Sequence, residues 1–198
     1  ESTRRQRQMC IRDRFNVWFQ IAIDAEVNEA NAMAISTISE EGTPRSRYVL
    51  FKDIVDNKLV FYSDYGSSKG REMENNPNIS GLFFWPELHR QIRLEGVVSK
   101  TSDEVSDNYF ASRPRGAQLS AIASSQSTEI EGRETVEDRI KELEIEFEGK
   151  DIPRPDNWGG YAIDISFWEF WQGRRSRTHD RFIYVKNDNS WEITRLSP

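Results

Sequence analysis

The sequence predicts a mainly β fold with helical additions, built as a barrel-like sheet in one domain. About seven or eight short segments have the alternating pattern or the β-branched and aromatic content of strands, and turn-forming residues separate them. The chain has 198 residues, of which 12% are aromatic, and this is enough for one sizeable core. Because neither an internal repeat nor a linker-like segment interrupts the chain, we expect one domain.

The N-terminal part is expected to contain one helix and three strands. Residues 15–27 place apolar side chains at helical spacing and predict an amphipathic helix. Residues 32–39 change to a strand-like pattern that ends at the turn sequence EEGTP. The alternating segment RSRYVLFK at 45–52 and the segment KLVFYS at 58–63 follow, joined by DIVDN, so we expect an antiparallel meander.

The middle part is expected to combine short helices with two strands. The sequence GSSKGREMENN at 66–76 suits a loop and a short helix, which Pro77 stops. Strands are expected at 79–85 and 91–99, where β-branched and aromatic residues are frequent. The sequence TSDE, at the start of 101–112, matches a capping box and predicts a helix.

The C-terminal part is expected to contain a surface helix and three strands. Residues 133–147 are strongly charged but keep apolar residues at helical spacing. The proline-containing segment IPRPDNW at 152–158 is typical of a connection. Strands are expected at 161–171, 181–186 and 191–195, with KNDNS as the turn between the last two.

The charge balance and the cysteine content argue against several classes of protein. The net charge is −6, whereas a general nucleic-acid-binding domain is normally basic. No apolar run reaches the length of a membrane span, and the N-terminus lacks the apolar stretch of a signal peptide. One cysteine, Cys10, cannot form an internal disulfide, and with only two histidines it makes a metal site unfavourable. We therefore expect a cytoplasmic protein without metal, nucleic acid or membrane as partners.

The first fourteen residues differ in character from the rest of the chain. The string QRQMCIRDR, residues 6–14, resembles a translated sequencing adapter. We expect residues 1–14 to be a non-native or disordered segment and residues 15–198 to form the single domain. The functional residues are therefore expected within 15–198.

The strongest sign of a binding site is the cationic segment EFWQGRRSRTHDRF at 169–182. It holds four arginines and one of the two histidines within eight residues, beside a tryptophan, in an acidic chain. Because the arginines repel one another, an anionic small molecule among them would explain the cluster. The alternative is a solvated basic hairpin.

Three further segments carry residues that could hold anions. Arg47 and Lys52 stand at the two ends of one expected strand, on opposite faces. Lys69 lies beside the start of a short helix, whose free N–H groups favour phosphate. Tyr109 and Arg113 share a helical face and could clamp a phosphate. Each feature alone also fits an ordinary strand end, loop or helix terminus, but together, without a metal or nucleophile motif, they favour an enzyme that uses an organic cofactor.

Several segments of the chain form recognisable motifs: RYVLFK, FYSDYGSSKGREMENNP, RQIRLEG, YFASRPRGAQ, SSQS, WGGY, FWQGRRSRTHDRF and WEITRLSP. The most specific of them is RxHDRF followed by a C-terminal RLxP. In these motifs, from about residue 15 to residue 198, the chain resembles the pyridoxine/pyridoxamine 5′-phosphate oxidase family, which depends on FMN.

The resemblance implies a split β-barrel that forms a homodimer, with FMN at the interface. It implies that the FMN contacts are Arg47, Tyr48, Val49, Leu50, Phe51, Lys52, Tyr62, Ser63, Lys69, Gln91, Gln126, Ser127, Trp171 and Arg181. Of these, Gln126 and Ser127 are expected to come from the partner subunit. It implies that the substrate is held by Lys52, Tyr109, Arg113, Arg177 and His179, of which the last two are the catalytic residues.

The reaction that the resemblance implies is the oxidation of pyridoxine or pyridoxamine 5′-phosphate to pyridoxal 5′-phosphate, with O₂ reduced to H₂O₂. One alternative is a related flavin oxidase that acts on a non-phosphorylated aromatic compound of the phenazine type. Lys52, Tyr109 and Arg113 argue against it, because a substrate without a phosphate does not need them. The other alternative is a split-barrel protein that binds flavin without turnover, against which Arg177 and His179 argue.

Two positions depart from the family pattern. Ser68 stands where an arginine is usual, at the FMN phosphate, and Ala117 stands where a serine is usual, at the substrate phosphate. Each loss removes one polar contact, worth about 1–3 kcal/mol if its partner is charged. We expect weaker binding rather than loss of binding.

Overall fold

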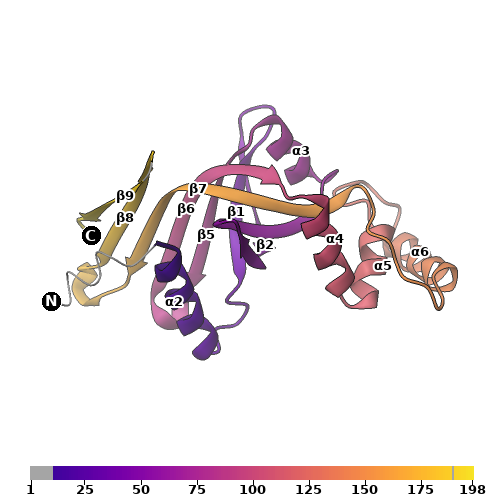
Figure 1. Ribbon diagram of the computed structural model, residues 1–198, viewed down its shortest axis with the longest axis horizontal. Helices are drawn as coiled ribbons and strands as arrows, with labels where there is room; N and C mark the ends of the chain where they lie inside the picture. Colours follow the sequence, from indigo (N-terminus) through magenta and orange to yellow (C-terminus); the bar gives the residue numbers. More distant parts are fainter. Residues whose placement is uncertain (1–10, 189) are drawn as a thin grey trace.

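The computed structural model describes residues 11–188 and 190–198, which form an antiparallel sheet flanked by helices (Figure 1). In chain order the elements are α2 (Ile11–Asp24), β1 (Ala32–Ile38), β2 (Pro44–Leu50), β3 (Asp53–Val55), β4 (Lys58–Asp64), α3 (Ser68–Asn75), β5 (Asn78–Trp85), η1 (Pro86–Leu88), β6 (Arg90–Lys100), α4 (Asp103–Ser112), α5 (Arg115–Ala123), α6 (Arg133–Glu146), β7 (Trp158–Gln172), η2 (Arg175–Arg177), β8 (Asp180–Asn187) and β9 (Ser190–Leu196). No helix among the described residues is long and apolar enough to cross a membrane.

The sheet curls into a barrel, as the sequence predicts. Its strand order is β2-β1-β5-β6-β7-β4-β3, and β8 and β9 extend it from β7. Strands β2 and β4 stand far apart in this order but contact each other, which brings the ends of the path together. The first half of β7 pairs with β4 and the second half with β8, so one strand links the barrel to the C-terminal hairpin.

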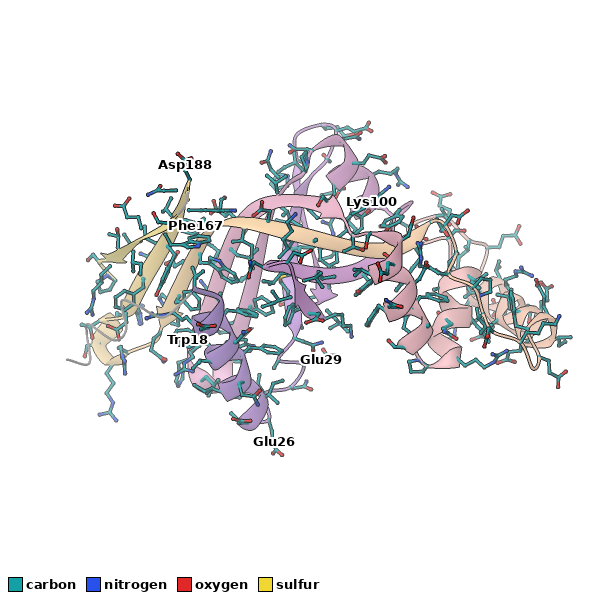
Figure 2. All side chains as sticks on the ribbon, viewed as in Figure 1. Trp18, Glu26, Glu29, Lys100, Phe167 and Asp188 are labelled. Atoms are coloured by element: carbon teal, nitrogen blue, oxygen red, sulfur yellow. The ribbon has the colours of Figure 1, made fainter. Side chains whose placement is uncertain are left out.

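The long axis of the molecule separates two ends with different structures. Strands β8 and β9 form one end, and helices α4, α5 and α6 form the other (Figure 1). Phe167, labelled on β7, and Asp188, at the tip of the β8–β9 hairpin, mark the first end in Figure 2. Between the two ends lies the barrel, whose interior is filled by aromatic rings.

Helix α2 closes the main core. Phe15 is fully buried, and its ring centroid lies 5.4 Å from each of the rings of Phe51, Phe83 and Trp168. Trp18 lies on the same helix (Figure 2), and its ring meets that of Phe170 edge-on at 5.3 Å. Burying such rings supplies most of the stabilisation that the hydrophobic effect can give a barrel of this size.

The helices at the other end have a second, smaller core. Phe110 of α4, Leu119 of α5 and Leu143 of α6 are almost completely buried, together with Ile152 and Trp158. The apolar spacing that predicted a helix at 133–147 is confirmed, because α6 uses Leu143 to pack against α5.

Three elements differ from the sequence-based expectation. The DIVDN segment was expected as a turn, but Asp53–Val55 pairs with Lys58–Val60 as β3, because Asp56 and Asn57 adopt positive φ and make a two-residue turn. Helix α5 was not expected: Pro114 ends α4, but it also precedes the first residue of a new helix, where proline is tolerated.

Helix α2 begins at Ile11, before the domain boundary expected at Phe15. Ile11 is buried in the main core, so residues 11–14 are part of the helix rather than disordered. The other residues of the 1–14 segment, 1–10 with Cys10 among them, lie outside the described residues.

Candidate functional site

A cavity of about 560 Å³ lies between β2, β4, α4, α5 and the segment after α5. Its wall combines residues from segments that are distant in the sequence. The predicted site residues that line it, called the cavity group below, are Tyr48, Val49, Leu50, Lys52, Tyr62, Ser63, Lys69, Tyr109, Arg113 and Gln126.

Strand β2 divides its side chains between the core and the solvent, as its alternation predicts. Val49 is 8% exposed and Phe51 6%, whereas Tyr48 is 74% exposed. The Phe51 side chain packs in the core against Phe15 and is absent from the cavity wall. The predicted contact of Phe51 with a ligand therefore cannot come from its side chain.

Lys69 is a buried cation held by neutral groups. Its Nζ donates to Oε1 of Gln126 at 2.7 Å and to Oγ of Ser67 at 3.3 Å, and Ser63 Oγ also donates to Gln126 Oε1 at 3.2 Å. Ser67 is the N-cap of α3 and accepts a hydrogen bond from the Gly70 N–H. Burial lowers the pKa of Lys69, and the neighbouring Arg47 lowers it further.

Arg47 is fixed by a buried carboxylate. Its Nη2 lies 2.8 Å from Oε2 of Glu72. The same oxygen accepts a hydrogen bond from the Thr37 hydroxyl at 2.5 Å, and the other oxygen, Oε1, lies 3.0 Å from Nη1 of Arg45. Burial would raise the pKa of Glu72, but hydrogen bonds from Thr37 and Arg47 outweigh it, so the pKa is lowered. Glu72 stays ionised and holds Arg47 beside the cavity.

Three nearly parallel aromatic rings form another wall of the cavity. Tyr62 of β4 and Tyr109 of α4 stack at 3.8 Å between centroids with 12° between planes. The Trp158 ring is parallel to both, within 11° of Tyr62 and 7° of Tyr109. Burial, and then the neighbouring Tyr109, raise the pKa of Tyr62 to about 12, so its phenol stays neutral.

Arg113 lies on this aromatic wall and has no carboxylate partner among the described residues. Its Cζ is 4.5 Å from the centroid of the Trp158 ring. Its Nη1 is buried and has no hydrogen-bond partner in the part of the chain that is described. Burial lowers the pKa of Arg113. A buried guanidinium nitrogen without a partner is costly, and an anionic ligand would satisfy it.

Five of the remaining predicted residues gather around the C-terminal half of β7, on β6, β7, β8 and the turn before β8. Gln91 of β6 lies opposite Trp171 of β7, which in turn lies opposite Arg181 of β8, so the three form one row across the sheet. Arg181 Nε donates to Oε1 of the buried Glu169 at 2.7 Å. Residues Gln91, Trp171, Arg177, His179 and Arg181 are called the hairpin group below.

The turn before β8 fixes the orientation of its histidine. The His179 ring lies 4.7 Å from the Trp171 ring, and its Nδ1 accepts a hydrogen bond from the backbone N–H of Arg174 at 3.1 Å. Because a backbone N–H can only donate, Nδ1 carries a lone pair and the ring proton is on Nε2. Ser176 and Arg177 have φ of 55° and 59°, a left-handed conformation that is uncommon for such residues and occurs at binding sites.

The cavity group and the hairpin group are separate within one chain. No member of the hairpin group lines the cavity. The cavity adjoins α4 and α5, whereas β8 lies at the opposite end of the molecule (Figure 1).

Gln126 corrects one expectation. It was expected to reach the site from a partner subunit, but it contacts Lys69 and Ser63 of its own chain. Ser127, with φ of 67°, is exposed and does not line the cavity.

Three residues of the site were missed in the sequence. Glu72 and Glu169 each hold a predicted arginine, and Trp158 carries Arg113. Nothing in the sequence separates these carboxylates from the many exposed ones, and only the WGGY motif marks Trp158. The described residues contain no group of three or more His, Cys, Asp or Glu that could hold a metal ion.

Comparisons with known proteins identify the family of the chain. A family profile described as pyridoxamine 5′-phosphate oxidase matches residues 19–146, and one described as the pyridoxine 5′-phosphate oxidase C-terminal dimerisation region matches 158–198. The pyridoxine/pyridoxamine 5′-phosphate oxidase of Rubrobacter xylanophilus is 48% identical over 184 residues, covering 93% of this chain and 85% of the relative. That of Burkholderia mallei is 50% identical over 187 residues, covering 93% and 87%.

Solved structures show the same fold. PhzG from Burkholderia lata 383, in complex with tetrahydrophenazine-1-carboxylic acid, matches with a TM-score of 0.88 and 31% identity, over 93% of this chain and 90% of that one. An FMN-binding protein of Nostoc punctiforme, related to pyridoxamine 5′-phosphate oxidase, matches with a TM-score of 0.75 over 93% and 97%. Its identity is 17%, so this likeness concerns the fold alone.

Proposed function

The chain belongs to the pyridoxamine 5′-phosphate oxidase family, and we propose that it oxidises pyridoxine or pyridoxamine 5′-phosphate to pyridoxal 5′-phosphate with O₂ as the acceptor. The observation that carries the proposal is the Arg113 guanidinium, which is partly buried in the cavity wall with an unpaired Nη1. Tyr109 and Lys52 line the same cavity. A phosphate ester would supply acceptors for these donors.

FMN is the cofactor that family membership assigns to the chain, and the residues present fit it. Lys69 is 8% exposed and forms no ion pair within the described residues, so a phosphate would supply its missing counter-charge. Ser63 and Gln126 add a hydroxyl and an amide beside it. When bound, FMN supplies a two-electron acceptor that takes up a hydride and returns the electrons to O₂ as H₂O₂.

The protein's own contribution is binding and orientation. Lys52, Tyr109 and Arg113 would hold the phosphate end of the substrate, and Arg177 and His179 would act at its ring. An arginine at the reacting end stabilises negative charge that develops there, and His179 can donate from Nε2. Holding two reactants in the reactive geometry can account for several kcal/mol of barrier lowering, about 7–11 kcal/mol at best.

We further propose that each site is completed by a second copy of the chain. The hairpin group cannot reach the cavity of its own chain in this fold, but a homodimer can bring it to the cavity of the other. The match of residues 158–198 to a dimerisation region supports this, because that segment contains most of the hairpin group.

One other substrate class has a specific observation in its favour. PhzG shares the fold at 31% identity and was solved with a phenazine derivative. A phosphate or a carboxylate could satisfy the buried Arg113 nitrogen. We favour the phosphorylated substrate because the chain is 48% and 50% identical to two pyridoxine/pyridoxamine 5′-phosphate oxidases but 31% identical to PhzG.

The deciding experiment follows the visible absorbance of the purified FMN protein without oxygen. Added pyridoxine 5′-phosphate or pyridoxamine 5′-phosphate should bleach the flavin, and pyridoxal 5′-phosphate should form in the same amount. Unphosphorylated pyridoxine should react far more slowly at equal concentration. Bleaching by a reduced phenazine carboxylate alone would contradict the proposed substrate, and no bleaching by any of them would indicate a binding protein.

A further inference from the structure

Arg113 differs from Arg47 and Arg181 in how it is held. Arg47 is bound to the carboxylate of Glu72 and Arg181 to that of Glu169. Arg113 has no ion pair and no side-chain hydrogen bond within the described residues, and its guanidinium lies instead over the Trp158 ring. We propose that Trp158 is a positioning residue that presents Arg113 to the substrate phosphate and so sets the preference for phosphorylated ligands.

An aromatic face holds an arginine without using its donors. A carboxylate occupies one or two of the five N–H groups and neutralises the charge, whereas a ring attracts the cation through its quadrupole. With Trp158 beneath it, the Arg113 guanidinium keeps its charge and its donors for a ligand. The attraction is stronger where water is excluded, and Trp158 is 7% exposed.

The indole is itself fixed relative to the helix that ends before Arg113. The backbone carbonyl of Trp158 accepts from Arg154 Nη1 at 2.7 Å, and Arg154 also binds Asp103 and Asp107 of α4 at 2.7 and 2.6 Å. The Trp158 ring meets that of Phe110, also on α4, at 5.3 Å. These contacts set the distance between the ring and the end of α4, where Arg113 is the C-cap.

The same ring also adjoins the cofactor side of the cavity. Trp158 is parallel to Tyr62, which was predicted to contact FMN, and to Tyr109, which was predicted to contact the substrate. The preference for phosphorylated ligands is nevertheless assigned to the contact with Arg113, because Arg113 is a cation that lies over the ring itself and lines the cavity.

The inference rests on the proposed function for the identity of the ligand, and it is tested by binding rather than turnover. The probes are 4-deoxypyridoxine 5′-phosphate and 4-deoxypyridoxine, which lack the oxidisable group at the 4′ carbon. Their dissociation constants are measured by calorimetry with the FMN-loaded protein. The ratio of the two constants reports the preference for the phosphate and is insensitive to a general loosening of the site.

Trp158→Leu should reduce this ratio about 5- to 30-fold, the range of a cation–π contact that is shielded from water. Trp158→Phe should keep most of it, because a ring remains. In an Arg113→Ala background, Trp158→Leu should reduce the ratio no further, because its effect acts through Arg113. Melting temperature and flavin content identify any variant that fails to fold, in which case Trp158→Phe and Trp158→Tyr carry the test.

Trp18→Leu is the matched control, because Arg90 lies over the Trp18 ring at the same distance of 4.5 Å but outside the cavity. It should leave the ratio unchanged. The inference would be overturned if Trp158→Leu lost the same affinity for both probes. It would also be overturned if Trp158→Leu reduced the ratio as much in the Arg113→Ala background as in the wild-type protein. A wild-type protein without preference for the phosphorylated probe would overturn it as well. A protein that prefers the phosphorylated probe but shows no turnover would refute the proposed reaction and leave the role of Trp158 intact.

Discussion

A heterodimer of one Arg113→Ala subunit and one Arg177→Ala subunit should recover activity that neither homodimer has. Arg113 lines the cavity, whereas Arg177 belongs to the hairpin group, which does not. If each site takes its cavity from one chain and its hairpin from the other, the heterodimer contains one intact site and one doubly altered site. Its activity should then be about half that of the wild-type dimer, because a two-fold dimer has two equivalent sites.

The activity of the heterodimer is compared with that of the two homodimeric variants, each of which should lose most of its activity. Arg113→Ala removes a charge-assisted contact of about 1.5–3 kcal/mol, which lowers kcat/KM about 10- to 150-fold. Arg177→Ala is expected to lower kcat, because this guanidinium acts at the reacting end of the substrate. Both homodimers should therefore fall well below half of the wild-type rate at low substrate concentration.

The assay uses two affinity tags. Subunits with different tags are co-expressed, the heterodimer is purified over both columns, and the initial rate of pyridoxal 5′-phosphate formation is measured below the wild-type KM. Two differently tagged Arg113→Ala subunits serve as the control for tagging and mixing. A heterodimer no faster than the mean of the two homodimers would refute the division of the site between chains.

Three further predictions concern single residues. Arg113→Ala should act mainly on KM and Arg177→Ala on kcat, and neither should release FMN, which the flavin spectrum after gel filtration checks. Glu72→Ala should lower the free energy of unfolding in urea by about 1–3 kcal/mol, because it removes the buried carboxylate that binds the half-buried Arg47 and the Thr37 hydroxyl, whereas Glu41→Ala, which removes an exposed partner of Arg45, should change it little. Lys69→Met should weaken FMN binding but stabilise the FMN-free protein at about pH 7, because burial lowers the pKa of Lys69 and protonated Lys69 opposes folding. This gain should shrink as the pH rises through the lowered pKa towards the ordinary value of 10.5, and a constant or growing gain in urea titrations would contradict the argument.

The local sequence predicted most strands and the orientation of several site residues. Alternation along 45–52 was enough to separate Tyr48, which is exposed, from Val49, which is buried. Alternation does not give register, however, and the row formed by Gln91, Trp171 and Arg181 depends on how three strands are aligned.

The partners of the cations could not be predicted from the sequence. Glu72 is one acidic residue among many on a short helix, and it meets Arg47 only because α3 packs against β1. The same holds for Gln126. It contacts Lys69 although the two residues are separated in the sequence by α4 and α5. Such contacts follow from tertiary packing, which local propensity and residue spacing do not predict.

The place of β7 in the sheet has a consequence for how the chain folds during synthesis. Strand β4 is complete at Asp64, but its neighbour β7 begins only at Trp158, roughly a hundred residues and about 5–20 s later on the ribosome. Until then β4 and β6 both present an unpaired edge, and edges of this kind recruit strands from other chains. The nascent chain is therefore most prone to aggregate before β7 emerges, and slower translation of residues 101–157 should lower the yield of native protein.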